Sequence, residues 1–250
     1  MDKQKNIQIY EDTQKVVLSR KLIAPQSVKY TPEQLYDLKM DRKYDATIIE
    51  VLNMDTLIAC QQLHEKYNIP HVLVLSGTKN VNILALNMTS ATNAGGGVKR
   101  GSRAQEEELF RRTNYFQTLL QSFYPLRDCG VYSPEICVIK DENYKLIKSF
   151  NVSMVAVSAI KNPYDIDEEY MRTTSKRINM IFKIAYSQGH DVLVLGAIGC
   201  GAYNNPPQKI IEIYNHYLKK YDGCFKHIVL AVLSKTDDNF KLFKESIKIC

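Results

Sequence analysis

Apolar and polar residues recur along most of the chain with two periods, one typical of strands and one typical of helices. Short apolar runs bounded by turn-forming residues predict strands, and apolar positions three or four residues apart predict helices. The predicted strands are Thr47–Leu52, Val72–Leu75, Asn82–Met88, Val131–Tyr132, Ile136–Ile139, Val152–Ser158, Asp191–Leu195 and His227–Leu233. The predicted helices are Asp55–Tyr67, Arg103–Phe123, Asp167–Ser187, Pro206–Lys220 and Asp238–Lys248.

Strands and helices alternate from residue 46 onward, a pattern that favours a mixed or parallel sheet covered by helices. We therefore expect an α/β fold, specifically a three-layer α/β/α sandwich. Residues 1–45 lack a clear apolar period, and we expect them to form a helical and loop extension packed on a domain of residues 46–250. Gly189 is predicted to end one helix and Pro206-Pro207 to begin the next, as glycine and proline commonly do.

The composition, 45% hydrophobic and 24% charged, is that of a globular protein. No run approaches the ~18 consecutive apolar residues that cross a membrane, and the first ten residues lack the apolar core of a signal peptide. The six cysteines form no C-x-x-C pair, and no histidine stands at zinc-finger spacing from them. We expect reduced, mostly buried cysteines in a soluble intracellular protein, located in the cytoplasm or, in a eukaryote or a virus, also in the nucleus.

The formal net charge is +6, from 33 Lys and Arg against 27 Asp and Glu. This mild excess suits a polyanionic ligand but does not identify one, because the lysines are scattered along the chain. The sequence has no basic arm or nucleic-acid motif. Direct binding of nucleic acid is therefore not predicted.

A glycine-rich loop before the predicted helix Arg103–Phe123 carries the first candidate chemistry. Three consecutive glycines, Gly95–Gly97, permit positive φ angles and a close approach of a ligand to backbone N–H groups. Ser102, with a glutamine three residues later, predicts a capping box and a helix that begins at about Arg103. The pair Glu106-Glu107 then falls in the first two turns of that helix.

Acidic residues at a helix start also have an ordinary explanation, since the helix dipole favours each by roughly 0.3–1 kcal/mol. The triple glycine upstream of Glu106 and Glu107 instead favours a functional explanation. Glu106 lies at the flank of the predicted core stripe, and Glu107 is rotated about 100° further from it. One carboxylate is thus predicted to be anchored while its neighbour faces a ligand. The stripe comprises Leu109, Phe116, Leu120 and Phe123.

A second glycine-rich loop, Gly196–Asn205, also follows an apolar strand and precedes a helix. Backbone N–H groups in such a turn can hold a diphosphate, and Tyr203 can place its ring against a ribose or a base. A glycine-rich turn between strand and helix is equally consistent with ordinary turn chemistry. The loop does not fit the G-x-G-x-x-G dinucleotide pattern and comes late in the chain.

Taken together, the two loops carry a resemblance to a known family. Asn93-Ala94-Gly95-Gly96-Gly97, followed after seven residues by Gln105-Glu106-Glu107, resembles the signature of poly(ADP-ribose) glycohydrolases. The segments Leu109–Arg112, Val131–Glu135 and Gly196–Pro207 are similar to the bacterial-type branch, in the family's order. That branch often has an aromatic residue after the triple glycine, where this chain has Val98.

The resemblance implies a macrodomain-like fold that binds ADP-ribose at the strand ends and hydrolyses ribose–ribose bonds without a metal or cofactor. By motif position, it implies that Glu107 is the catalytic acid and that Glu106 and Asn93 hold the distal ribose. It places Gly95–Gly97 and Gly199–Tyr203 around the diphosphate, with tyrosine at a position where the family usually has phenylalanine. The implied site residues are Asn93, Gly95, Gly96, Gly97, Gln105, Glu106, Glu107, Gly199, Cys200, Gly201, Ala202 and Tyr203.

The implied substrate is poly(ADP-ribose) or an ADP-ribosylated protein, and the implied product is ADP-ribose. Two other classes of activity stay open: hydrolysis of mono-ADP-ribose or of a modified nucleic acid on the same fold, and ADP-ribose binding without catalysis. A non-catalytic reader predicts loss of the acid, whereas Gln105-Glu106-Glu107 is intact. A nucleophilic role for Cys200 lacks an identifiable partner, because no histidine stands in a catalytic motif.

Overall fold

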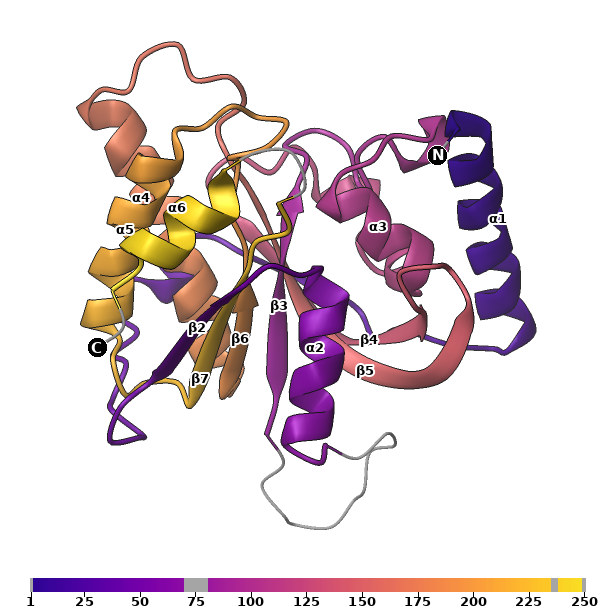
Figure 1. The fold of residues 1–250 in the computed structure, drawn as a ribbon, viewed down its shortest axis with the longest axis horizontal. Coiled ribbons are helices and arrows are strands. Elements are labelled where there is room, and N and C mark those ends of the chain that lie inside the picture. Colours follow the sequence, from indigo (N-terminus) through magenta and orange to yellow (C-terminus); the bar gives the residue numbers. More distant parts are fainter. Residues whose placement is uncertain (1, 70–80, 235–237, 249–250) are drawn as a thin grey trace.

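The computed structural model describes residues 2–69, 81–234 and 238–248. Within this part of the chain, seven strands form one sheet in the order β1-β4-β5-β3-β6-β7-β2 (Figure 1). The strands are β1 (Val28–Tyr30), β2 (Ile48–Leu52), β3 (Ile83–Thr89), β4 (Gly130–Lys140), β5 (Leu146–Ser158), β6 (Val192–Leu195) and β7 (His227–Ala231). The helices are α1 (Lys3–Ser19), α2 (Thr56–Lys66), α3 (Gln105–Arg112), α4 (Glu168–Ser187), α5 (Pro207–Lys220) and α6 (Asn239–Ser246). Short 3-10 turns are η1 (Glu33–Leu35), η2 (Val98–Arg100), η3 (Tyr115–Gln117) and η4 (Gln121–Phe123).

The sheet is mixed. Five neighbouring strands are parallel to one another, in the order β5, β3, β6, β7 and β2. Strands β4 and β1 extend the sheet beyond β5 in antiparallel pairing. In β3, Leu84 and Leu86 face one layer, while Ile83 and Ala85 face the other. The strand is apolar on both faces because each is covered by helices.

Helices α4, α5 and α6 lie on one side of the sheet, and α2 and α3 lie on the other (Figure 1). Helix α1 forms an outer layer against α3 and η2. The prediction of a three-layer α/β/α sandwich with a mixed sheet is confirmed. The predicted strand Val72–Leu75 lies outside the described residues. The segment 1–45 supplies β1 as well as α1, so it joins the sheet as well as packing on it.

The predicted helix Arg103–Phe123 is wrong in its length, because α3 ends at Arg112. Thr113 is extended and pairs with Val138 of β4. The side chain of Asn114 accepts a hydrogen bond from the N–H of Cys137 at 2.8 Å, and its own N–H donates to the Cys137 carbonyl. These two polar residues bind the neighbouring strand instead of continuing the helix. Of the predicted core stripe, only Leu109 is fully buried, and Leu120 is exposed.

The predicted capping box is also wrong. The residue that precedes α3 is Ala104, which makes no side-chain cap, and the amide of Gln105 is bonded to β3 instead. A third difference concerns the segment from Val131 to Ile139, where two strands were expected. A single strand, β4, runs through it with a register shift between Ser133 and Ile136, and Glu135 takes a positive φ of 52°.

Candidate active site

The two glycine-rich loops follow neighbouring strands. β3 and β6 are parallel and hydrogen-bonded, so the loops that leave their carboxyl ends start side by side, where α/β folds commonly bind ligands. Burial raises the pKa of Tyr124, and the nearby Glu106 carboxyl group and the phenol of Tyr203 in the second loop add smaller contributions. Tertiary structure therefore brings the second loop to the surroundings of the first.

Glu106 is anchored by three donors at the start of α3. Its Oε1 accepts from Thr89 Oγ1 at 2.6 Å and from the N–H of Gly95 at 3.1 Å. Its Oε2 accepts from the N–H of Ser90 at 2.7 Å. Burial raises the pKa of Glu106 to about 7, although these hydrogen bonds oppose the shift. The carboxyl group thus joins the start of α3 to the end of β3 and to the first loop.

Glu107 is buried but only half satisfied. Its Oε1 accepts from the N–H of Gly97 at 2.8 Å, whereas its Oε2 is buried and has no hydrogen-bond partner among the described residues. Only 6% of the residue is exposed. A buried carboxyl oxygen without a partner is costly, and in a native protein it calls for an explanation such as a catalytic role. Of the two adjacent glutamates, Glu107 is therefore the one left with an oxygen available for chemistry.

Two of the three glycines of the first loop hold these carboxyl groups. The N–H groups of Gly95 and Gly97 donate to Glu106 and Glu107, and that of Gly96 donates to the Asn93 carbonyl. A Cβ atom at Gly96, whose φ is +57°, would stand 2.5 Å from Glu107 Oε1 and 3.0 Å from Glu106 Oε2. Gly96 is thus required by the protein's own carboxyl groups, whereas a Cβ at Gly95 would meet the ring of Phe110 and a Cβ at Gly97 would meet Ser102. Contact between their backbone and a diphosphate stays a prediction.

Gln105 fixes α3 to the sheet. Its Oε1 accepts from the N–H of Met88 at 2.9 Å, and its Nε2 donates to the Leu86 carbonyl at 2.6 Å and to Thr56 Oγ1 at 3.2 Å. Both amide N–H groups are therefore engaged within the protein. This arrangement favours a positioning role for Gln105, one place before the two glutamates.

The second loop differs from the first in the hydrogen bonding of its backbone N–H groups. The backbone N–H groups of Gly199, Gly201, Ala202 and Tyr203 donate to no other residue that the structure describes. Gly201 and Ala202 are exposed, and Tyr203 is half-buried. Unsatisfied amides before the start of a helix, here α5, suit a phosphate group. Cys200 is half-exposed, and its thiol approaches the Ile198 carbonyl at 3.8 Å.

Comparison with known proteins assigns these loops to a family. The model of the microbial-type PARG catalytic domain matches residues 1–141, more than half of the chain. The chain belongs to this family. A PARG, or poly(ADP-ribose) glycohydrolase, is a glycosidase, so the chain is a catalytic domain of an enzyme of that class. No curated protein sequence matches the chain.

Solved structures of PARG enzymes share the fold over nearly the whole chain. PARG from Thermomonospora curvata is 24% identical with a TM-score of 0.83, and the alignment covers 97% of this chain and 99% of that one. The structure of the same enzyme bound to the inhibitor ADP-HPD is 25% identical with a TM-score of 0.79, and the alignment has the same coverage. PARG from Deinococcus radiodurans in complex with ADP-ribose is 24% identical with a TM-score of 0.74. That alignment covers 88% of this chain and 93% of the other.

The match to the PARG family includes α1, a helix whose contribution the sequence did not reveal. Asn6 donates from Nδ2 to the carbonyl of Gly101 at 3.0 Å, and its own carbonyl accepts from the buried guanidinium of Arg111. Thr13 donates to the carbonyl of Arg111. Arg111 also pairs with Glu108 at 3.0 Å. Helix α1 thus supports the turn before α3 and the last turn of α3, the helix that carries the two glutamates.

Asn205, whose role the sequence also did not reveal, holds the second loop of this PARG-family domain. The side chain is buried, and its Nδ2 donates to the carbonyls of Ile160 at 2.7 Å, Tyr203 at 3.1 Å and Gly199 at 3.3 Å. Its Oδ1 accepts from the hydroxyl of Tyr170, on α4, at 2.9 Å. One amide therefore ties the loop to the end of β5 and to α4. A polar residue that follows a glycine-rich loop gives no local sign of such a role.

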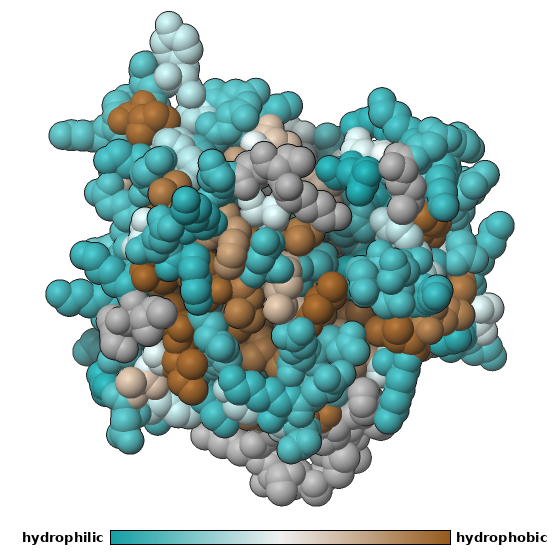
Figure 2. All heavy atoms as spheres, viewed as in Figure 1, coloured by the Kyte–Doolittle hydropathy of each residue, from teal (hydrophilic) through white to brown (hydrophobic). Residues whose placement is uncertain are grey.

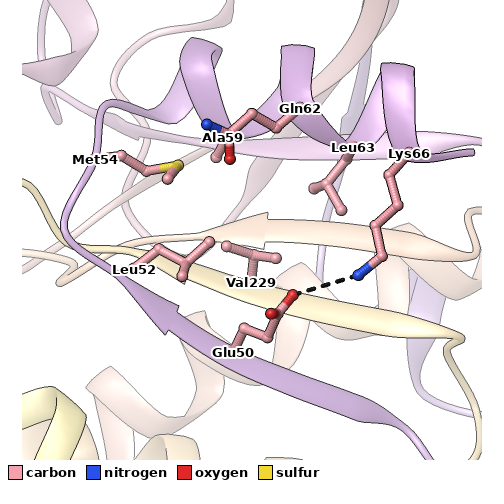
Figure 3. A pocket seen from close by; sticks show the side chains of 8 residues that line it. All are labelled: Glu50, Leu52, Met54, Ala59, Gln62, Leu63, Lys66 and Val229. Carbon is pink, nitrogen blue, oxygen red and sulfur yellow. Dashed lines mark ion pairs between the residues drawn. The ribbon is translucent and has the colours of Figure 1, made fainter.

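Asn93, at the other end of the predicted site, is exposed, and its Nδ2 donates to its neighbour Thr92. Away from both loops, a hollow of about 220 Å³ opens between α2 and β2 (Figure 3). The ion pair of Lys66 with Glu50, 3.7 Å long, crosses its edge. Apolar atoms gather on the same face of the molecule (Figure 2). No predicted site residue lines this hollow. Its lining residues are Glu50, Leu52, Met54, Ala59, Gln62, Leu63, Lys66 and Val229.

Two further observations concern the part of the chain that the structure describes. No helix there is long and apolar enough to cross a membrane. No group of three or more His, Cys, Asp or Glu side chains is arranged there to hold a metal ion.

Proposed function

We propose that this PARG-family domain hydrolyses the ribose–ribose O-glycosidic bonds of poly(ADP-ribose) and releases ADP-ribose, with Glu107 as the catalytic acid. The observation that carries the proposal is the carboxyl group of Glu107. One oxygen is held by the N–H of Gly97, and the other is buried without a hydrogen-bond partner in the part of the chain that the structure describes. A leaving-group oxygen placed at Oε2 would complete its hydrogen bonding and receive its proton.

The chemistry follows from the position of the two glutamates. Ordinary glycosidases place two carboxyl groups on opposite faces of the scissile bond, ~5–9.5 Å apart. Adjacent residues of one helix, Glu106 and Glu107, cannot do so. Protonated Glu107 therefore transfers its proton to the 2′-oxygen as the glycosidic bond breaks, and the substrate's own diphosphate faces the oxocarbenium charge. The Glu107 carboxylate then takes a proton from the attacking water, which leaves ADP-ribose with a free hydroxyl.

Other residues hold the substrate in this proposal. The exposed side chain of Asn93 and the anchored carboxyl group of Glu106 bind the distal ribose. The amides of Gly199, Gly201, Ala202 and Tyr203, which have no partner among the described residues, bind the diphosphate, and the ring of Tyr203 packs against the ligand. The solved PARG structures that contain ADP-ribose and ADP-HPD support a ligand of this class. Gln105 acts beside them by holding the start of α3.

The decisive test is to incubate the protein with poly(ADP-ribose) and, separately, with a mono-ADP-ribosylated protein, and to quantify free ADP-ribose. We expect release from the polymer. Release from the mono-modified protein alone would indicate a mono-ADP-ribosyl hydrolase. Binding of ADP-ribose without release from either substrate would indicate a reader.

We also expect turnover of the polymer to proceed without an added metal, because proton transfer by Glu107 supplies the chemistry. The measurement compares initial rates before and after dialysis against EDTA. Activity that disappears with the chelator and returns with a divalent ion would contradict this mechanism.

The role of Asn205 gives a further prediction. We expect Asn205→Ala to lower the free energy of unfolding by about 1–3 kcal/mol, because it removes the hydrogen bonds of a buried amide and leaves the Tyr170 hydroxyl without its acceptor. Loosening of the second loop should also weaken ADP-ribose binding about tenfold, equivalent to ~1.4 kcal/mol. Thermal melts and calorimetric titration measure the two effects.

The matched control for Asn205→Ala is Tyr170→Phe, which removes only the hydroxyl that donates to Asn205. Tyr170→Phe should lower the free energy of unfolding but leave the hydrogen bonds from Asn205 to the loop carbonyls in place. It should therefore change the affinity for ADP-ribose less than Asn205→Ala does. Equal loss of affinity in the two variants would show that Asn205 does not act through the loop.

A further inference from the structure

Five exposed basic side chains gather beside the first loop. Lys3 and Lys5 lie at the start of α1, Lys99 and Arg100 lie on η2, and Arg103 precedes α3. None of the five forms an ion pair with another residue that the structure describes. We call these residues the basic cluster.

The basic cluster is held together by contacts between segments that are far apart in the sequence. Gly101 has a φ of +73°, and its Cα packs so closely on the main chain of Lys3 that a Cβ there would overlap the Lys3 carbonyl. Asn6 then donates to the carbonyl of Gly101 at 3.0 Å. Figure 1 shows the start of α1 beside η2. Cations that repel one another are therefore kept close by the fold, and a polyanion would relieve that repulsion.

The basic cluster is close to the proposed acid. Lys99 is two residues after Gly97, whose N–H binds Glu107, so their Cα atoms are within roughly 7 Å along the chain. Arg103 is four residues before Glu107 in the chain and two residues before the start of α3. The nearby carboxyl group of Glu108 is already paired with Arg111, and Asp2 bonds the N–H of Gln4.

The other side of the two loops carries the opposite charge. The segment between β5 and α4, together with the first two residues of α4, holds four exposed carboxyl groups and one lysine. The segment bonds to the second loop, because the N–H of Asn162 donates to the carbonyl of Tyr203 at 2.9 Å. In Figure 1 this segment and the start of α1 lie on opposite sides of the loops that follow β3 and β6. The acidic residues are Asp165, Asp167, Glu168 and Glu169.

We propose that the basic cluster binds the part of the poly(ADP-ribose) chain that continues beyond the bond being cleaved. This inference rests on the proposed function. Every unit of the polymer carries a diphosphate, so the continuing chain is drawn over η2 and the start of α1 and repelled by the segment that precedes α4. A nucleic acid has similar phosphate chemistry. The polymer is favoured because the basic cluster continues directly from the loop that holds Glu107, and the remaining chain is covalently joined to the unit in the site.

The test compares neutralised variants with a control on the far side of the molecule. The variants are K3Q/K5Q and K99Q/R100Q, separately and combined, and the control is K241Q/K244Q on α6, where both lysines are exposed. Affinities for long poly(ADP-ribose) and for ADP-ribose are measured at two salt concentrations. We expect the combined variant to lose about tenfold in affinity for the polymer at low salt, with a shallower salt dependence, by analogy with lost phosphate contacts in nucleic-acid complexes.

The affinity of K3Q/K5Q for ADP-ribose and the affinity of the control for both ligands should stay within about twofold, because these exposed charges are screened over short distances. Equal losses for polymer and ADP-ribose, or equal losses in variant and control, would overturn the proposal. Single-stranded RNA that competes as well as the polymer would make the basic cluster a nucleic-acid surface. Failure of the wild-type protein to release ADP-ribose would instead contradict the proposed function, and the binding measurements do not depend on turnover.

Discussion

Glu107→Gln should reduce turnover of poly(ADP-ribose) by about 10²–10⁴-fold, the usual contribution of a general acid and base. The amide keeps the size of the side chain, and its oxygen can still accept from the N–H of Gly97. It cannot supply or take the proton. Binding of ADP-ribose should therefore stay within about threefold of wild type, a change of less than ~1 kcal/mol. Single-turnover rates and calorimetric titration separate the two effects.

Glu108→Gln is the matched control, because it removes the next carboxylate from the first turn of the same helix. It weakens the ion pair with the buried Arg111 and so should lower the melting temperature. The folded protein should nevertheless turn over polymer at close to the wild-type rate. Near wild-type turnover by purified Glu107→Gln would eliminate Glu107 as the acid.

Gly96→Ala should reduce turnover of poly(ADP-ribose) by about 10²-fold or more while the protein still folds. The added Cβ would stand 2.5 Å from Glu107 Oε1 and 3.0 Å from Glu106 Oε2, closer than real contacts allow. The loop is held by α3 and β3, so the two carboxyl groups must move. Displacement of a reacting group by ~1 Å costs about 10²-fold in rate. We also expect weaker ADP-ribose binding, because Glu106 is proposed to hold the distal ribose.

Gly189→Ala separates this effect from backbone strain. Gly189 has a φ of +73° after α4, but no atom lies within 4 Å of the added Cβ. Both variants should lose ~1 kcal/mol or more of stability from the unfavourable φ. Only Gly96→Ala should lose activity. A Gly96→Ala protein that melts lower but cleaves polymer normally would show that the triple glycine serves the turn alone.

Local patterns in the sequence were sufficient for most of the architecture and for the position of the site. Hydrophobic periodicity predicted β3, β6, α4 and α5, because a strand or helix buried on one or two faces repeats its apolar residues at a fixed interval. Gly189 and Pro207 marked helix ends by their own backbone preferences. The two loops, with Glu106 and Glu107 at a helix start, could likewise be located from glycine content and spacing.

Only the tertiary structure decided how those residues are used. Helix α3 stops at Arg112 because Thr113 and Asn114 find partners on β4, and the Gln105 side chain bonds to β3 instead of a cap. Likewise, the amides of Gly95 and Gly97 bind the glutamates, while those of Gly199, Gly201, Ala202 and Tyr203 have no partner among the described residues. Asn6 and Asn205 are ordinary polar residues in the sequence. Each such role depends on hydrogen-bond partners that folding brings together from distant segments. No repeating pattern in the sequence shows whether a polar side chain will bond to a local or to a distant partner.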